Sequence, residues 1–193
     1  MTGDIVFYHP VTKTLMEHKA KILGEIGSVV AFRISPYPWR MNDVDVLDDL
    51  VLHDFHNFRY MTNWPNVQII GTPVHRSLMR PKQKDYCSFR ASTIDDVSFA
   101  STSAWIPGDS KMRLTYVRGN KTTAEMDYVT KKLRIGLETE GKNVVEIPVQ
   151  KEDELRNELK EFVEFVGGKK NILTPVEREM ETLIQMRPIL YPD

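Results

Sequence analysis

The amino-acid sequence predicts an α/β fold, a three-layer Rossmann-like sandwich with a mostly parallel sheet and an irregular β-rich middle segment. Short apolar runs alternate with amphipathic helical patterns near both ends of the chain, which is the order expected of strands joined by helices. The apolar runs are continuous rather than alternating, as in strands buried on both faces of a parallel sheet. Residues 86–105 are instead rich in serine and threonine, which suggests an antiparallel addition.

The first half of the chain predicts three strands and two helices. Apolar runs at 4–8, 28–34 and 67–70 each stop at a proline, a glycine or another turn-forming residue, as buried strands do. Between these runs, apolar residues recur at helical spacing and predict helices over 10–26 and 43–63.

The second half predicts four more strands and three helices. Residues 86–105 are interpreted as two short strands, and apolar runs predict further strands at 112–117 and 143–149. An amphipathic helical pattern covers 155–166, and a last helix is expected over 172–187.

Another helix is expected after the strand at 112–117. Thr122 and Glu125 form a capping-box pattern, in which the threonine accepts from the N3 amide and the glutamate reaches back. Apolar residues then recur at helical spacing, at Met126, Val129, Leu133 and Leu137.

We expect one α/β domain over residues 1–166, with an irregular insertion at about 75–110. A linker-like segment with two glycines, Gly167–Asn171, separates this domain from the C-terminal helix over 172–187. Such a helix could pack elsewhere or on a second copy of the chain, and in the second case the protein would be a homo-oligomer. The residues expected in the core are Val29, Val30, Ile69, Leu114, Val117, Leu133, Val144, Val145 and Phe162.

Length, charge and cysteine content exclude several classes of protein. The chain has 193 residues, a formal net charge of −1 at pH 7 and one cysteine, Cys87. No apolar run approaches the ~18 residues of a membrane-spanning helix, and the N-terminus lacks the basic and apolar regions of a signal peptide. A single cysteine forms no internal disulfide, which fits a reducing compartment. We therefore expect a cytoplasmic protein without a membrane partner, in which Cys87 is buried and structural.

Cationic residues gather at the predicted ligand-binding edge of the sheet. In open α/β sheets, ligands bind beyond the carboxyl ends of the strands. The cationic residues near those ends are His9, Arg33, His75, Arg76, Arg118 and Lys121. This edge should therefore prefer an anionic ligand.

The turn after the strand at 112–117 is the leading candidate for a phosphate site. The amides and dipole of a helix start bind anions, and two basic side chains add charge. The residues expected to hold the phosphate are Arg118, Gly119, Asn120, Lys121 and Thr122, with Arg33 close by. His9 and Asp43 are the expected proton-transfer groups.

These residues predict a protein that binds a phosphorylated small molecule, a nucleotide or a nucleotide derivative. The same pocket would serve a nucleotide-processing hydrolase or transferase, or a non-catalytic sensor or inhibitor, and only turnover separates these hypotheses. The sequence contains neither the GxxxxGK[ST] phosphate loop nor the GxGxxG dinucleotide fingerprint. It therefore identifies no cofactor.

A basic segment supports an alternative function in nucleic-acid binding. Residues 75–90 contain five lysines or arginines against one aspartate, with Tyr86 and Phe89 between them. Such a loop can hold a phosphate backbone and stack a base. The balanced charge of the whole chain argues against a dedicated nucleic-acid binder.

Two further patterns resemble metal sites, but neither is assigned as one. His53 and His56 lie on one helical face, as metal ligands must, yet they flank the apolar stripe and are interpreted as a surface pair. Asp43 and Asp45 match the DxD pattern of nucleotide-sugar transferases. They also complement the dipole of a helix that Asn42 is expected to cap, which explains them without a metal.

Overall fold

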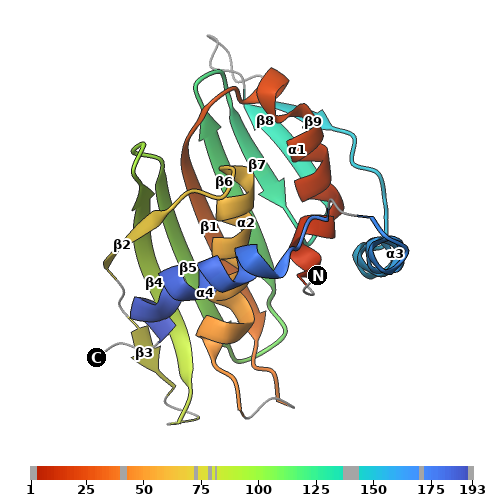
Figure 1. Ribbon diagram of the computed structural model, residues 1–193. Helices are drawn as coiled ribbons and strands as arrows, with labels where there is room; N and C mark the ends of the chain where they lie inside the picture. The colour runs from red at the N-terminus through yellow and green to blue at the C-terminus, as the bar shows by residue number, and fades with distance from the viewer. Residues whose placement is uncertain are drawn as a thin grey trace.

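The computed structural model describes residues 4–39, 43–71, 74–77, 80, 82–136, 144–169 and 172–190. In these ranges the chain forms one nine-stranded sheet, and the helices that contact the sheet lie on one of its faces (Figure 1). None of the helices in these ranges is long and apolar enough to cross a membrane.

Most strands follow one another directly along the chain. The helical elements are the 3-10 helix η1 (Ile5–Tyr8), α1 (Pro10–Ile22), the π-helical turn η2 (Leu47–Val51), α2 (Leu52–Met61), α3 (Glu154–Val166) and α4 (Val176–Leu190). The strands are β1 (Ile26–Pro36), β2 (Val67–Gly71), β3 (Val74–Arg76), β4 (Lys84–Thr93), β5 (Ser98–Ile106), β6 (Met112–Gly119), β7 (Thr123–Asp127), β8 (Lys132–Gly136) and β9 (Val144–Ile147). Within the described ranges, no helix interrupts the series from β2 to β9.

The sheet is mixed and mostly antiparallel. Its order is β2-β4-β5-β1-β6-β7-β8-β9, and β3 also pairs with β4. Among the strand pairs of the described residues, only β1 and β5 run parallel. The predicted α/β class is confirmed, whereas the prediction of a mostly parallel sheet is wrong. The reason is the short connections, because strands joined by tight turns can pair only antiparallel.

The predicted third layer is not formed by the described residues. Helices α1, α2 and α4 contact β7 and β8, β5, and β2 respectively, all on one face (Figure 1). On the opposite face, Phe32 and Tyr116 are 37% and 40% exposed. The described chain is therefore a two-layer structure.

Two predicted elements have a different secondary structure. In the segment 4–8, predicted as a strand, residues 5–8 form η1, because the Asp4 side chain accepts from the Val6 amide and caps the turn. The helix predicted from Thr122 is the hairpin of β7 and β8. The remaining predicted strands and helices are found near their expected positions, and α4 continues through Pro188.

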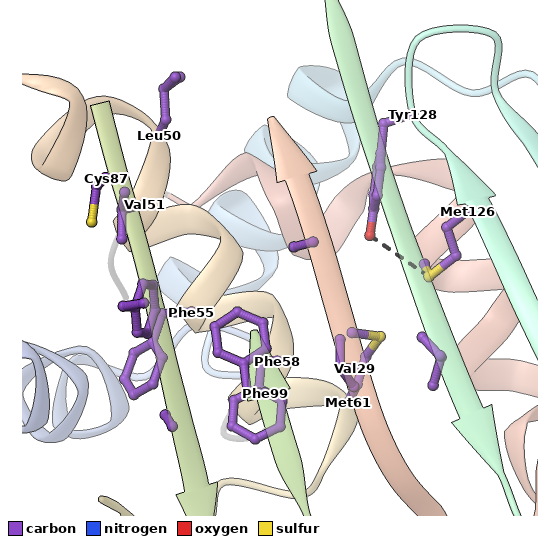
Figure 2. Close-up of a cluster of buried hydrophobic side chains, with 14 of the residues drawn as sticks. Val29, Leu50, Val51, Phe55, Phe58, Met61, Cys87, Phe99, Met126 and Tyr128 are labelled. Atoms are coloured by element: carbon purple, nitrogen blue, oxygen red, sulfur yellow. Dashed lines mark hydrogen bonds between the residues drawn. The ribbon is translucent and has the colours of Figure 1, made fainter. Parts of the chain in front are cut away.

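Helix α2 packs its aromatic side chains on β5, as Figure 2 shows. The rings of Phe58 and Phe99 are stacked with centroids 4.5 Å apart, and Phe55 lies 6.1 Å from Phe99. Cys87 is fully buried in the same cluster, as expected. Burial raises the pKa of its thiol to about 12, so this cysteine is structural rather than reactive.

The predicted core is correct in the middle of the sheet and wrong at its end. Three of the predicted core residues are fully buried, namely Val29, Val117 and Leu133. Three others are half-buried, namely Val30, Ile69 and Leu114. The exposed ones are Val144, Val145 and Phe162, because β9 is the last strand of the sheet and α3 packs on η1.

The C-terminal helix α4 packs on its own chain. Arg59 on α2 donates to Thr182 Oγ1 at 2.5 Å, and the Val67 amide donates to Gln185 Oε1 at 2.9 Å. Met186 and Ile189 are fully buried in the common core. These contacts give no support to the predicted docking of this helix on a second copy.

Replacing Leu133 by alanine should lower the free energy of unfolding by about 2–5 kcal/mol, because it removes a fully buried side chain and leaves a cavity. Denaturant unfolding measures this loss. The matched control is Val144→Ala on the neighbouring strand, where the side chain is 62% exposed and the change should stay within about 0.5 kcal/mol. Equal losses in the two variants would contradict the register of β8 and β9.

Candidate functional site

The clearest candidate site lies where η2 and α2 face the ends of β1 and β6. A cavity of about 230 Å³ opens there. Its lining consists of Ile5, Val6, Arg33, Ser35, Asp49, Leu50, His53, Lys111 and Arg113. The π-helical turn η2 forms one wall, and such turns are frequent at functional sites.

Asp49 and His53 lie one helical turn apart and both line this cavity. Trp105 on β5 donates its Nε1 hydrogen to Asp49 Oδ2 at 3.1 Å. His53 Nδ1 lies 3.1 Å from Asp4 Oδ1. Each polar side chain is thus held by a residue from another element, which fixes its orientation toward the cavity.

A buried ion pair holds α2 against the central strand. Arg33 on β1 donates from Nε and Nη2 to Asp54 Oδ1 at 2.9 and 2.5 Å. Both side chains are almost fully buried. The predicted binding residue Arg33 therefore does line the cavity, but its charge is already matched by Asp54.

Arg113 is the cross-strand neighbour of Arg33 on β6. Its guanidinium lies over the Tyr128 ring, 4.5 Å from the centroid, and its buried Nε has no hydrogen-bond partner. Burial and the nearby charge of Arg33 lower the pKa of Arg113 to about 10. Two arginines therefore stand side by side at the cavity, and within the described ranges only Arg33 has a carboxylate partner.

The predicted surface pair of histidines is in fact part of a buried network. Asp4 Oδ2 lies 2.5 Å from His56 Nδ1, while Asp4 Oδ1 contacts His53. On its other side, His56 Nε2 lies 2.9 Å from Glu179 of α4. His56 is almost fully buried, so the interpretation as a surface pair is wrong, at least for this residue.

The network shifts the pKa values of its members. Although burial alone raises the pKa of Asp4, hydrogen bonds and charge from His53 and His56 hold it well below its usual range. Burial alone lowers the pKa of His56, but hydrogen bonds to Asp4 and Glu179 outweigh it and raise the pKa to about 9. At neutral pH His56 is therefore a buried imidazolium between two carboxylates.

The same residues are the metal-binding candidates of the described chain. Asp4, His53 and His56 bring potential ligand atoms within 4.8 Å of one another. A metal ion would have to displace the proton that Asp4 and Glu179 hold on His56. The arrangement is thus explained as an ion network that positions His53.

The two predicted proton-transfer groups lie outside the cavity lining. His9 Nδ1 accepts from the Val11 amide and caps α1. Burial and the charge of Arg113 lower the pKa of His9 to about 4, which leaves it neutral.

Asp43 is exposed, and Asn42, its predicted capping neighbour, lies outside the described residues. Asp45 accepts from the Leu47 amide at 2.9 Å, a capping role as expected.

The predicted phosphate turn connects β6 and β7 as a hairpin and does not begin a helix. Its amides are already bonded: Gly119 to Thr122, Asn120 to Glu25, and Lys121 to Leu23. The polar side chains of Lys121 and Thr122 donate to carbonyls at the end of α1. A side chain at position 119 would also clash with the Leu23 carbonyl, with Cβ 2.1 Å from its oxygen.

The turn therefore joins α1 to the sheet, and Arg118 is left exposed beside it. That this turn binds phosphate stays a prediction, without the free helix amides that motivated it. Nucleic-acid binding by the basic segment at 75–90 has less support from the structure, because Phe89 is buried in the core and is not available to stack on a base.

Sequence reasoning missed Asp4, Asp49, Lys111 and Arg113. Asp49 had a usable signal, since it lies four residues before His53 and so on the same helical face. Asp4 and Arg113 had none, because their proximity to His53 and Arg33 depends on the tertiary fold.

Comparison with known proteins identifies the fold. Neither a protein-family model nor a curated protein matches this sequence. Among solved structures, a UDP-N-acetylglucosamine 3-dehydrogenase from Acidithiobacillus ferrooxidans has a TM-score of 0.80 at 16% identity, over 95% of this chain and 59% of that one. A 3-ketoreductase from Actinomadura kijaniata, in complex with NADP, has a TM-score of 0.72 at 15% identity, over 94% and 56%.

A third similar structure is the aldose-aldose oxidoreductase from Caulobacter crescentus complexed with glycerol. Its TM-score is 0.77 at 16% identity, over 98% of this chain and 60% of that one. This chain thus spans less than two thirds of each of the three proteins. At these identities the likeness shows a shared fold, in which the mixed sheet and its helix layer correspond to part of each oxidoreductase.

The buried His56 network should make stability depend on pH. The pKa of His56 in the folded protein is about 9, above the ordinary 6.5. The stabilisation that His56 contributes is therefore complete below pH 6.5 and is lost as pH rises through 9. The free energy of unfolding should fall by about 3 kcal/mol over that window. Urea unfolding at a series of pH values measures the fall.

In His56→Gln this pH dependence should disappear, whereas the exposed control His18→Gln should keep it. A fall of the same size in His56→Gln would show that other groups are responsible.

Proposed function

We propose that this chain binds a sugar or a sugar nucleotide in the cavity beside Asp49 and His53. His53 moves a hydroxyl proton of that sugar in an oxidation or reduction whose hydride is exchanged with a nicotinamide cofactor held outside the described residues. The observation that carries the proposal is His53, which lines a cavity while a buried carboxylate holds one of its ring nitrogens. The fold adds support, because the three similar structures are a dehydrogenase of a sugar nucleotide, a ketoreductase and an aldose oxidoreductase.

His53 is placed to take or give a proton. Asp4 contacts Nδ1 and so fixes the ring, and within the described ranges Nε2 has no partner. A neutral imidazole oriented in this way is a general base, and its protonated form is a general acid. The hydroxyl proton of a bound sugar is the proton that this residue would move.

Asp49 is placed to bind sugar hydroxyls. The Trp105 indole donates to Oδ2, which leaves Oδ1 as an acceptor within the cavity lining. Hydrogen bonds to an ionised group contribute about 1.5–3 kcal/mol each, so one such contact is worth roughly tenfold to a hundredfold in affinity. Ser35 adds a hydroxyl to the same lining.

The described residues do not fit a nicotinamide dinucleotide. Such a cofactor requires a glycine-rich turn between a strand and a helix N-terminus. The sequence contains no GxGxxG, and the glycine turn at 119 joins two strands with its amides already bonded. We therefore propose that this chain binds the sugar and moves its hydroxyl proton, and we assign to it no step on a dinucleotide.

Asp49→Asn should weaken the binding of UDP-N-acetylglucosamine at least tenfold, because the amide removes the charged acceptor. Isothermal titration calorimetry with this sugar nucleotide measures the affinity. The matched control is Asp95→Asn, an exposed aspartate outside the cavity, which should bind like the wild type. Equal affinities for the wild type and Asp49→Asn would remove the cavity from the site.

A further inference from the structure

We propose that the cavity selects an acidic sugar, one whose carboxylate or phosphate group pairs with the Arg113 guanidinium. This inference rests on the proposed function and names the class of substrate that the same site would take. It is carried by an arginine that the fold leaves without a carboxylate at the wall of the cavity.

The charges that line the cavity do not balance. Arg33, Lys111 and Arg113 contribute three cations, and Asp49 contributes one carboxylate. Arg33 is neutralised by Asp54 from outside the lining. Lys111 and Arg113 then remain beside Asp49. The nearby carboxylates outside the lining, Asp4 and Asp54, already contact His53, His56 and Arg33, and within the described ranges neither forms an ion pair with Arg113.

Arg113 is the arginine of the lining that has no carboxylate partner. It stands directly opposite Arg33 across the β1–β6 pair, so two like charges are adjacent on the helix-covered face. No ion pair to Arg113 occurs within the described ranges, and its buried Nε makes no hydrogen bond. Burying a charged group without a partner is costly, and a perturbed charged group that lines a cleft is a candidate for contact with a ligand.

Stacking on Tyr128 explains the orientation of the Arg113 side chain but does not neutralise its charge. The ring lies 4.5 Å from the guanidinium carbon and supports it by a cation–π contact. Such a contact stabilises a cation less than a paired carboxylate does, and it leaves the N–H edge of the guanidinium unused. That edge matches two oxygens of a carboxylate or phosphate, which is the pairing that arginine forms best.

Three sugars that share the glucose ring distinguish a carboxylate from a phosphate as the recognised group: glucuronate, glucose 6-phosphate and the neutral glucose. Calorimetry at constant ionic strength should show at least one acidic sugar binding tenfold or more tightly than glucose. Which acidic sugar binds better distinguishes a carboxylate site from a phosphate site. Binding of glucose as tight as that of both acidic sugars would overturn the inference.

Arg113→Gln should abolish the preference for the acidic sugar. Arg113→Lys should reduce it, because an ammonium keeps the charge but not the forked geometry. The matched control is Arg156→Gln, an exposed arginine on α3 outside the cavity lining, which should retain the preference. An unchanged preference in Arg113→Gln would also overturn the inference.

Thermal melting without ligand separates this role from a purely structural one. If Arg113 awaits a ligand, Arg113→Gln should melt at or above the wild-type temperature, because it removes an unpaired charge. A marked fall in melting temperature would identify a structural arginine instead.

If none of the three sugars nor UDP-N-acetylglucosamine binds, the proposed function fails as well. If Asp49→Asn still weakens sugar binding while acidic and neutral sugars bind alike, only the inference of an acidic substrate fails.

Discussion

The buried ion pair between Arg33 and Asp54 is the interaction on which the candidate site depends. It ties α2 to the central strand β1, with two donor contacts of 2.9 and 2.5 Å. Removing one partner of such a pair leaves an uncompensated buried charge, which typically costs about 3–5 kcal/mol. Because Asp49 and His53 belong to the same continuous helix as Asp54, the pair also sets where these two side chains meet the cavity.

Helix α2 is unusual because its polar side is also buried. Phe55 and Phe58 pack on the sheet, while Asp54 and His56 form ion pairs with β1, with the chain before η1 and with α4. Desolvating these charges is costly unless each has a partner. The partners come from distant parts of the chain, so the network both closes the helix layer and holds His53 at its edge. Arg113 is the neighbouring charge that this scheme leaves unmatched.

Local sequence patterns predicted elements better than they predicted pairing. The strands around Val29 and Val117 follow from their apolar runs. The segment after Thr122 has the sequence pattern of a helix, because its apolar residues fit a spacing of three to four, yet it forms a hairpin. Ala124 and Met126 also fit a period of two, and the turn before β8, where Lys131 has φ +55°, resolves the ambiguity in favour of a hairpin. The ion network was not predictable, since Asp4 meets His53 only through tertiary packing.

In the proposed site, ligands bind at the cavity beside η2 and not at the hairpin turn after β6. A nuclear magnetic resonance titration with UDP-N-acetylglucosamine tests this most directly, because it reports on every labelled site at once. If the ligand binds at this cavity, the His53 imidazole and the Arg113 Nε–H signals should shift together and saturate at one affinity. Shifts confined to the turn Arg118–Thr122, with His53 and Arg113 unmoved, would contradict it.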